Sequence, residues 1–475
     1  MQLTKVLDAP KRAGIGEVKG PGDGPLGAKS TVYRRFLFLQ GPHGPFFRDL
    51  ALALKRDGHG AMRVGFSRAD QREWGDAGGY QPYTGAMEAF PDWLTDLIEQ
   101  RGVTDIVLYG DTRPAHGAAL RAAKAKGLET HCFEEGYLRP YWITYERGGA
   151  NGNSRLMDFA VRDMAAASRM ANVELEEAPP IWGAAWRHAF HGFRHHADVL
   201  FRNHAYPDFA PHRPTSLSRE LGLYLRRLLV LPLLVPERRL RERRLLRSGI
   251  SYHLVLLQLA VDASMRSHSD FDTVAEFVDF CLSAFAAGGR PDHHIVFKTH
   301  PFEDGRERLE AHAKQRAREL GLEDRVLFLQ GGKLGALLDR ARSAVTINST
   351  AGQQALWRGL PLSVNGDAVY GKPEFTADQD LASFFAAPLA PDQGLYREFR
   401  QFLLLTSQLR GGFYSRRGRD VAIAAAVEKM IDPLDPYDRI FAASREAMAE
   451  QSAQSNIAVL NLPRARRANG KSEFL

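Results

Sequence analysis

The chain has 475 residues, 44% of them hydrophobic and 25% charged, with a formal net charge of +7. This composition is typical of a globular protein of about two or three domains, and it excludes collagen-like, low-complexity and disordered classes. The two cysteines, Cys132 and Cys281, can form at most one bridge, so a disulfide framework and a cysteine-based zinc site are also excluded. A reducing cytoplasm is the simplest location for such a chain.

Two features bear on secretion and membrane insertion. Residues 1–30 are rich in Gly, Pro and Lys and lack the apolar stretch of a secretory signal, so we interpret them as a flexible leader. The apolar run at 228–235 is interrupted by Pro232 and is shorter than the roughly 20 residues that cross a bilayer. The sequence therefore predicts an intracellular protein without a transmembrane helix.

Residues 31–165 predict an N-terminal Rossmann-like domain. The predicted elements are strands over 35–40, 61–66, 104–109 and 129–133, and helices over 46–56, 91–100 and 115–126. Strands that alternate with helices at this spacing are typical of a parallel, doubly wound sheet. The ligands of such sheets bind in the loops beyond the carboxyl ends of the strands, at the point where the strand order reverses.

Residues 166–248 lose this alternation and are rich in His, Arg and Trp, which indicates a helical, basic insertion or bridge. A second alternating series follows and predicts a C-terminal Rossmann-like nucleotide-sugar domain over 249–390. Its predicted elements are strands over 252–260, 294–298, 326–328 and 344–347, and helices over 271–287, 306–320 and 334–341. Helices over 391–455 and a flexible basic tail over 456–475 complete an α/β protein whose two doubly wound domains face each other across a cleft.

The basic insertion contains a segment, 226–247, with eight arginines and two glutamates threaded between leucines. Its central cationic residues are Arg238, Arg239, Arg241, Arg243 and Arg244. One interpretation is contact with an anionic membrane surface, and the other is a solvated helix whose leucines pack on the domain. Because no recognised module or aromatic platform accompanies the arginines, we do not expect nucleic-acid binding.

The strand over 294–298 ends in Lys298, Thr299, His300 and Pro301. A cation and a protonatable hydrogen-bond donor at a strand end suit a phosphate ester and the charge that develops when it departs. The alternative is an ordinary strand end that exposes a lysine and a histidine. Alone, this pair leaves both interpretations open.

The strand over 344–347 runs into a hydroxyl-rich turn where a helix begins. The residues that can face an anion there are Asn348, Ser349, Thr350, Gly352 and Gln353. Ordinary capping by Ser or Thr would give the same pattern. Two phosphate-suited strand ends in one domain together favour recognition of a nucleotide phosphate.

In the first domain, the strand over 129–133 leads into Glu134, Glu135 and Gly136. One carboxylate that faces a cleft could serve as general base or nucleophile while its neighbour pairs with a cation such as Arg139. A solvated acidic turn is the alternative. Further candidates for the cleft are Gly41, Gly44, Asp111, His116, Gln258, Asp262 and His268, although Asp111 also suits a helix cap. The sequence has no metal-ligand motif, so it predicts no metal. It also has no GxSxG nucleophile turn and lacks the glycine spacing of a dinucleotide fingerprint or a P-loop, which argues against dehydrogenase and kinase functions.

The chain contains, in this order, the strings FLQGPHGPFF, LYGDTRPAH, FEEGYLRPYWIT, LVLLQ followed by HSDF, FKTHP and TINSTAGQQAL. As a set, these strings resemble the bacterial capsule polysaccharide biosynthesis family. Its members transfer β-linked 3-deoxy-manno-octulosonic acid (Kdo) from CMP-Kdo. The resemblance covers residues 35–430 and is strongest with the shorter, single-module member that primes the lipid anchor. It implies a GT-B-like glycosyltransferase with the cytidine nucleotide in the C-terminal domain. Related proteins often carry Asp at the second acidic position, where this chain has Glu135.

The resemblance also implies the reaction. The acceptor would be a lysophosphatidylglycerol on the inner leaflet, which places the protein at the inner face of the cytoplasmic membrane. CMP-Kdo would be a donor substrate, with no further cofactor, and the transfer would retain the anomeric configuration. Glu134 or Glu135 would assist substitution while His300 and the 348–350 turn stabilise departing CMP. The alternatives are a sialyltransferase-like enzyme with another CMP-sugar, or a non-catalytic partner of other capsule biosynthesis and export proteins.

Overall fold

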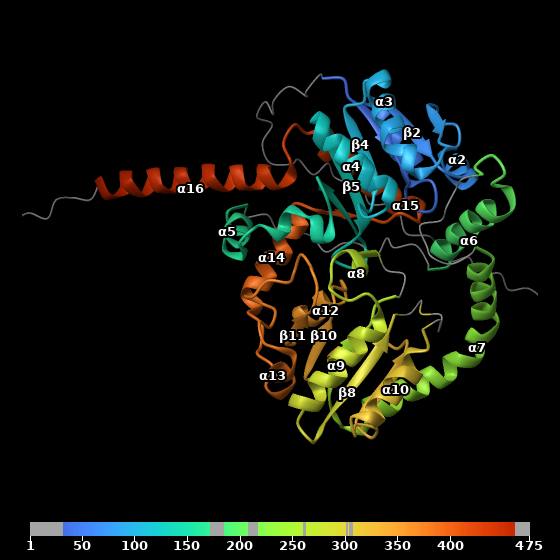
Figure 1. Ribbon diagram of the computed structural model, residues 1–475. Coiled ribbons are helices and arrows are strands. Elements are labelled where there is room, and N and C mark those ends of the chain that lie inside the picture. Colours follow the sequence, from blue (N-terminus) through green and yellow to red (C-terminus); the bar gives the residue numbers. More distant parts are fainter. Residues whose placement is uncertain are drawn as a thin grey trace, which may run out of the picture. The chain divides into compact units, whose positions relative to one another are not determined.

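The computed structural model describes residues 32–171, 185–207, 217–259, 263–300, 303 and 307–460. The described chain forms two predominantly parallel sheets, each flanked by helices, as Figure 1 shows. The expected α/β class with two Rossmann-like sheets is therefore confirmed. Across the described residues, no helix has both the length and the apolar composition needed to cross a membrane.

The N-terminal sheet has seven strands in the order β12-β6-β5-β4-β1-β2-β3. The strands are β1 (Arg35–Phe38), β2 (Gly60–Gly65), β3 (Tyr80–Pro82), β4 (Asp105–Tyr109), β5 (Glu129–Glu135), β6 (Trp142–Arg147) and β12 (Gln408–Arg410). β1 to β5 are parallel, whereas β6 pairs antiparallel with β5 and with β12. The strand order reverses between β1 and β4, which makes their carboxyl ends the switch point of this sheet.

Helices pack against this sheet through apolar faces set by the helical period. They are α1 (Phe46–Arg56), α2 (Arg68–Trp74), α3 (Phe90–Arg101), α4 (Pro114–Lys126) and α15 (Arg416–Ile431). One apolar cluster joins Phe47 of α1 to Ile423 of α15, and another joins Leu94 of α3 to Ala119 of α4. Gly102 ends α3 in the left-handed conformation that favours glycine.

The C-terminal sheet has five parallel strands in the order β11-β10-β7-β8-β9. The strands are β7 (Ser251–Leu256), β8 (His293–Thr299), β9 (Val326–Gln330), β10 (Ser343–Thr346) and β11 (Leu362–Val364). Its helices are α8 (Ala263–Ser267), α9 (Val274–Gly288), α10 (Leu309–Glu319), α11 (Leu334–Leu338), α12 (Gly352–Trp357) and α13 (Leu381–Ala386). The strand order reverses between β7 and β10, so the second switch point lies at their carboxyl ends.

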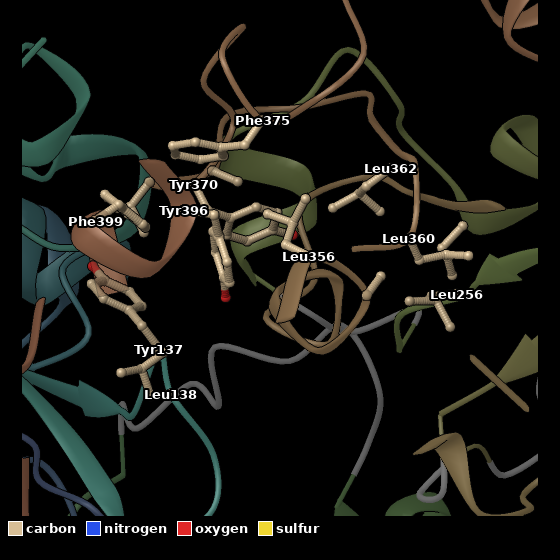
Figure 2. Close-up of a cluster of buried hydrophobic side chains, with 14 of the residues drawn as sticks. Tyr137, Leu138, Leu256, Leu356, Leu360, Leu362, Tyr370, Phe375, Tyr396 and Phe399 are labelled. Carbon is tan, nitrogen blue, oxygen red and sulfur yellow. The ribbon is translucent and has the colours of Figure 1, made fainter. Parts of the chain in front are cut away.

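The remaining helices are α5 (Val161–Ala171), α6 (Ala185–Arg202), α7 (Leu217–Ser248), α14 (Gln393–Leu405) and α16 (Pro436–Leu460). A buried apolar cluster takes Tyr137 from the N-terminal sheet region, Leu256 from β7 and Tyr396 from α14. Figure 2 shows these side chains together with Tyr370 and Phe399. The two sheets are thus joined by a shared apolar core.

The predicted strands and helices of both series are present, with ends shifted by a few residues. Three details are wrong. β5 continues through Glu135, so the acidic pair lies in the strand; β7 ends at Leu256; and the region predicted to be all-helical contains β12. α16 continues to Leu460, into the predicted tail, while the predicted leader lies outside the described residues.

Candidate functional site

The switch point of the C-terminal sheet is closed by two amide side chains that follow β7 and β10. Gln258 Nε2 donates to Asn348 Oδ1 at 2.8 Å, and the Asn348 backbone N–H donates to Gln258 Oε1 at 3.2 Å. Asn348 Nδ2 also donates to the His268 carbonyl at 3.1 Å. All three side chains are buried. The structure therefore brings Asn348, predicted to bind the donor, together with Gln258 and His268, predicted to lie in the cleft, and their hydrogen bonds hold the loop after β10.

The loop after β10 leads directly into α12. The Ser349 N–H donates to Thr346 Oγ1 at 3.3 Å, and the Ala351 N–H donates to Ser349 Oγ at 3.3 Å. A Cβ atom at Gly352 would lie 2.7 Å from the Tyr370 hydroxyl, so only glycine fits there without displacement. The tight turn sets the positions of the Ser349 and Thr350 hydroxyls.

A cavity of about 490 Å³ lies at this switch point, and we call it the switch-point cavity. Its predicted residues are Arg139, Lys298, His300, Ser349, Thr350 and Gln353. Tyr137 and Leu138, from the connection after β5, line it as well. Gln353 Nε2 donates to the Tyr137 carbonyl at 3.0 Å. The cavity thus has one wall from each sheet region.

Lys298 supplies a buried cation to the switch-point cavity. Its Nζ donates to the Thr299 carbonyl at 3.3 Å, and no carboxylate within the described chain forms an ion pair with it. Burial lowers the pKa of Lys298, while the charge of Glu242 acts in the opposite direction. An anion in the cavity would offset the cost of burying this charge.

The cavity also has an aromatic wall that sequence reasoning missed. The indole of Trp357 is half exposed, and the guanidinium of Arg400 lies 4.5 Å from its ring centroid. Tyr396 of α14 lines the same wall and donates its hydroxyl to the Gln353 carbonyl at 2.9 Å. Trp357 lies on α12 and Arg400 on α14, which are separated along the chain, so no local sequence motif could predict the pair.

The acidic pair occupies the last two positions of β5. Glu134 Oε1 accepts a hydrogen bond from the Glu135 N–H at 3.0 Å. Burial, reinforced by the charge of Glu135, raises the pKa of Glu134 to about 7, although the Glu135 N–H, Arg113 and Arg139 act in the opposite direction. Glu134 can therefore hold or release a proton near neutral pH.

Glu135 has a different environment because successive side chains of a strand point to opposite faces. Its Oε1 accepts hydrogen bonds from the Tyr414 hydroxyl at 3.0 Å and from the Tyr109 hydroxyl at 3.4 Å. The Tyr414 ring stacks on His188 of α6, with ring centroids 4.2 Å apart. Neither tyrosine was a candidate from the sequence, and Tyr414 lies 279 positions beyond Glu135.

Neither Glu134 nor Glu135 lines the switch-point cavity itself. They lie two to five positions before the three residues, Tyr137 to Arg139, that do. Arg139 connects the acidic pair to the switch-point cavity. It lines the cavity, and its positive charge partly opposes the rise in the pKa of Glu134 that burial causes. The acids are therefore adjacent to the cavity wall and not part of it.

Other predicted cleft residues have structural contacts. Asp111 Oδ2 accepts from the Ala150 N–H at 2.9 Å and from Asn153 Nδ2 at 3.1 Å, and α4 has no side-chain cap, so Asp111 is not the cap of α4. His116 is fully buried, and its Nδ1 makes a 2.7 Å hydrogen bond with the Gly110 carbonyl. Neither Asp111 nor His116 lines the switch-point cavity.

The predicted glycines allow close packing. A Cβ atom at Gly41 would lie 2.7 Å from the Phe47 ring, and one at Gly44, whose φ is +112°, would lie 3.1 Å from His191 Nδ1 of α6. His268 packs in the same way on Gly152, at 2.3 Å from an added Cβ atom. Two further candidates, Asp262 and Pro301, lie outside the described residues.

The candidate membrane arginines fall into two groups. Arg241 pairs with Glu237 and Glu310, both at 2.8 Å, and Arg238 Nη2 donates to Gln330 Oε1 at 3.1 Å. Arg239, Arg243 and Arg244 are exposed and form no ion pair with described residues. The contacts of Arg238 and Arg241 fit a helix that packs on the domain, and contact of the exposed arginines with a membrane stays a prediction.

Metal binding was not expected from the sequence. Within the described part of the chain, no three His, Cys, Asp or Glu side chains gather closely enough to hold a metal ion. A transfer reaction without a metal stays a prediction.

Comparison with known proteins identifies relatives over most of the chain. Residues 104–414 match the model of the family described as capsule polysaccharide biosynthesis protein. The capsule polysaccharide export protein KpsS of Escherichia coli is 32% identical over 382 residues, which cover 80% of this chain and 97% of KpsS. The capsule polysaccharide modification protein LipB of Neisseria meningitidis is 32% identical over 387 residues, covering 80% and 91%.

Among solved structures, one described as KpsC, β-Kdo 2,7-transferase, from Thermosulfurimonas dismutans is similar. It is 14% identical with a TM-score of 0.41, and the match covers 84% of this chain and 99% of that one.

Proposed function

The chain belongs to the capsule polysaccharide biosynthesis family, and from this premise we propose that it is a glycosyltransferase that moves β-Kdo from CMP-Kdo to a lysophosphatidylglycerol. This transfer would begin the linker of a capsular polysaccharide at the inner face of the cytoplasmic membrane. The observation that carries the proposal is the switch-point cavity, where Lys298, His300 and the Ser349–Thr350 hydroxyls converge at the carboxyl edge of a parallel sheet.

The donor would bind with its phosphate at Lys298. A phosphate neutralises the buried ammonium, and the Ser349 and Thr350 hydroxyls and His300 offer further hydrogen bonds. The aromatic face of Trp357, braced by Arg400, suits the stacking of a pyrimidine base. These groups also stabilise the charge on CMP as it leaves.

The sugar would extend past Arg139 toward the acidic pair. Glu135, held by the hydroxyls of Tyr109 and Tyr414, is fixed as a hydrogen-bonded carboxylate that can attack the anomeric carbon while the bond to the CMP oxygen breaks. Glu134 would then take the proton of the acceptor hydroxyl as that oxygen displaces Glu135. Two displacements give retention of configuration.

The test is incubation of the full chain with CMP-Kdo and a fluorescent lysophosphatidylglycerol, with the product identified by mass. We expect a single Kdo addition, and a Glu135→Gln variant without turnover and without a Kdo adduct in intact-mass spectra. Glu129→Gln, at the exposed start of the same strand, is the matched control and should retain turnover. Transfer from CMP-sialic acid and not from CMP-Kdo would contradict the proposal that CMP-Kdo is the donor.

The alternative of a non-catalytic assembly partner makes a different prediction. Such a protein would neither bind CMP nor release it from any CMP-sugar, and it would co-purify with capsule export proteins. Calorimetry with CMP alone separates the two, because the proposed enzyme must bind the product nucleotide.

A further inference from the structure

A second cavity, of about 610 Å³, lies between α7 and the turn that follows β9. We call it the α7 groove. Its lining includes the cationic residues Arg238, Arg239, Arg243 and Lys333 and the apolar residues Val235 and Leu246. Gly332 lines both the α7 groove and the switch-point cavity, so the two are neighbours at the carboxyl edge of the C-terminal sheet.

The α7 groove is built by specific contacts between α7 and this turn. Gly331 and Gly332 both adopt positive φ angles, +96° and +88°, and a Cβ atom at Gly332 would lie 3.2 Å from the Glu242 carboxyl group. The Lys333 N–H donates to Glu242 Oε1 at 2.7 Å. Together with the hydrogen bond from Arg238 to Gln330, this contact holds the helix against the strand end.

The charges of α7 are distributed unequally around the helix. On the side of α10, Arg241 is neutralised by Glu237 and Glu310. On the side of the α7 groove, Arg239, Arg243 and Lys333 are exposed and form no ion pair with described residues. Glu242 is the single carboxylate in the lining, and the Lys333 N–H already occupies one of its oxygens. The α7 groove therefore carries an excess of positive charge.

The lining also indicates the class of ligand. Val235, Leu246 and Ala336 lie among the cations, and Leu240 on α7 is 48% exposed. Cations interleaved with aliphatic side chains on a helix match an amphiphile whose head is anionic. Among the described residues, the lining of the α7 groove contains no aromatic side chain on which the bases of a nucleic acid could stack.

We propose that the α7 groove binds the phosphate of a glycerophospholipid headgroup and so presents a lipid acceptor beside the donor. The assignment of this lipid as acceptor rests on the proposed function, whereas lipid binding at the α7 groove does not. Arg239 and Arg243 lie four residues apart on one helix face and supply the charge-assisted hydrogen bonds. The aliphatic side chains of Val235 and Leu246 in the lining then contact the apolar part of the lipid.

The test compares the full-length wild type with two double variants. Arg239→Gln with Arg243→Gln removes two cations from the α7 groove. Arg121→Gln with Arg318→Gln removes two exposed arginines that lie outside both the α7 groove and the basic segment of α7, and serves as the charge-matched control. Each protein is sedimented with phosphatidylcholine vesicles that contain or lack phosphatidylglycerol, and CMP binding is measured separately by calorimetry.

We expect the groove variant to lose about tenfold or more in affinity for phosphatidylglycerol vesicles, with the control close to wild type. The apparent KM for the lipid acceptor should rise in parallel, while the Kd for CMP stays unchanged. An equal loss of vesicle affinity in both double variants, or an affinity that does not depend on phosphatidylglycerol, would overturn the proposal.

Soluble glycerol 3-phosphate gives a further arm. Groove-dependent binding of this compound without any dependence on phosphatidylglycerol would show a site for free phosphate esters, and this also overturns the lipid assignment. A wild type that binds no CMP refutes the proposed transferase and leaves the vesicle measurement interpretable. The failure of either idea is thus visible without the other.

Discussion

Gln258 and Asn348 exchange two hydrogen bonds across the switch point of the C-terminal sheet, although 90 residues separate them. The Gln258 side chain donates to the side chain of Asn348 and accepts from its backbone N–H, and both side chains are buried. Because Asn348 begins the turn that carries Ser349 and Thr350, the pair couples the end of β7 to the shape of the switch-point cavity.

Replacing Gln258 by Ala should therefore destabilise the fold and weaken nucleotide binding together. The change removes the hydrogen bond that Gln258 donates to the buried Asn348 Oδ1 and the one that it accepts from the Asn348 N–H, which costs about 1–3 kcal/mol. Urea denaturation and calorimetry with CMP measure the two effects. Gln315→Ala, on the surface of α10, is the control, and an equal effect there would refute the role of the Gln258–Asn348 pair.

The acidic residues Glu134 and Glu146 predict a pH dependence of stability. Burial raises the pKa of both to about 7, above the ordinary value of 4.5. Between these values each of the two groups holds more protons in the folded state than in the unfolded state, so its contribution to stability is fully present below about pH 4.5 and is lost as pH rises to about 7. Each group contributes at most about 3 kcal/mol to this loss. Urea titrations across this range in Glu134→Gln and Glu146→Gln should each show a shallower slope.

The pH profile of kcat/KM should distinguish the role of Glu134 from that of Glu146. Glu146 accepts hydrogen bonds from the hydroxyls of Tyr137, Tyr437 and Ser154 and does not line the switch-point cavity. Glu134→Gln should abolish the inflection near pH 7 in the profile of kcat/KM, and Glu146→Gln should keep it. An inflection that persists in Glu134→Gln would assign the titration to another group.

The phenol of Tyr414 is expected to position Glu135. Tyr414→Phe removes the shorter of its two tyrosine hydrogen bonds and keeps the ring that stacks on His188. We expect kcat to fall about tenfold, with a KM for the donor within about twofold, since one hydrogen bond to a charged group is worth about 1.5–3 kcal/mol. Tyr33→Phe, at an exposed phenol, should leave both constants unchanged. A change confined to KM would argue against positioning.

The indole of Trp357 is expected to contribute to nucleotide affinity. Trp357→Ala removes the ring that Arg400 braces, and stacking of a base on an aromatic side chain is worth about 1–3 kcal/mol. The Kd for CMP should rise at least fivefold in calorimetry. Phe280→Ala, another exposed aromatic residue that lies outside the switch-point cavity, is the comparison and should bind CMP as the wild type does.

The sequence predicts what depends on local pattern. Period and turn residues located α1 at its observed bounds, and they placed Lys298 and Asn348 at strand ends because a run of apolar residues stops there. The fold class and the switch-point residues of the C-terminal sheet follow from such runs. Of these, His300, Ser349 and Thr350 meet in one cavity, as parallel strand ends should.

Long-range pairing explains what the sequence missed. Glu134 and Glu135 precede a glycine and were interpreted as lying after the strand, but pairing with Thr144 and Ile143 of β6 extends β5 through both acids. The aromatic wall and the Tyr414 hydroxyl come from helices and loops far along the chain. Their contacts depend on tertiary packing, which no window of neighbouring residues encodes.

The return of the chain to the N-terminal sheet through β12 has a consequence for biosynthesis. β12 supplies an edge strand beside β6, and α15 completes the apolar cover of α1. The first half of the polypeptide therefore stays unfinished on the ribosome until residues beyond 430 have emerged. A fragment that stops at 390 would contain both acids and every strand of the second sheet, yet it would leave β6 as an unpaired edge and Glu135 without the hydroxyl of Tyr414.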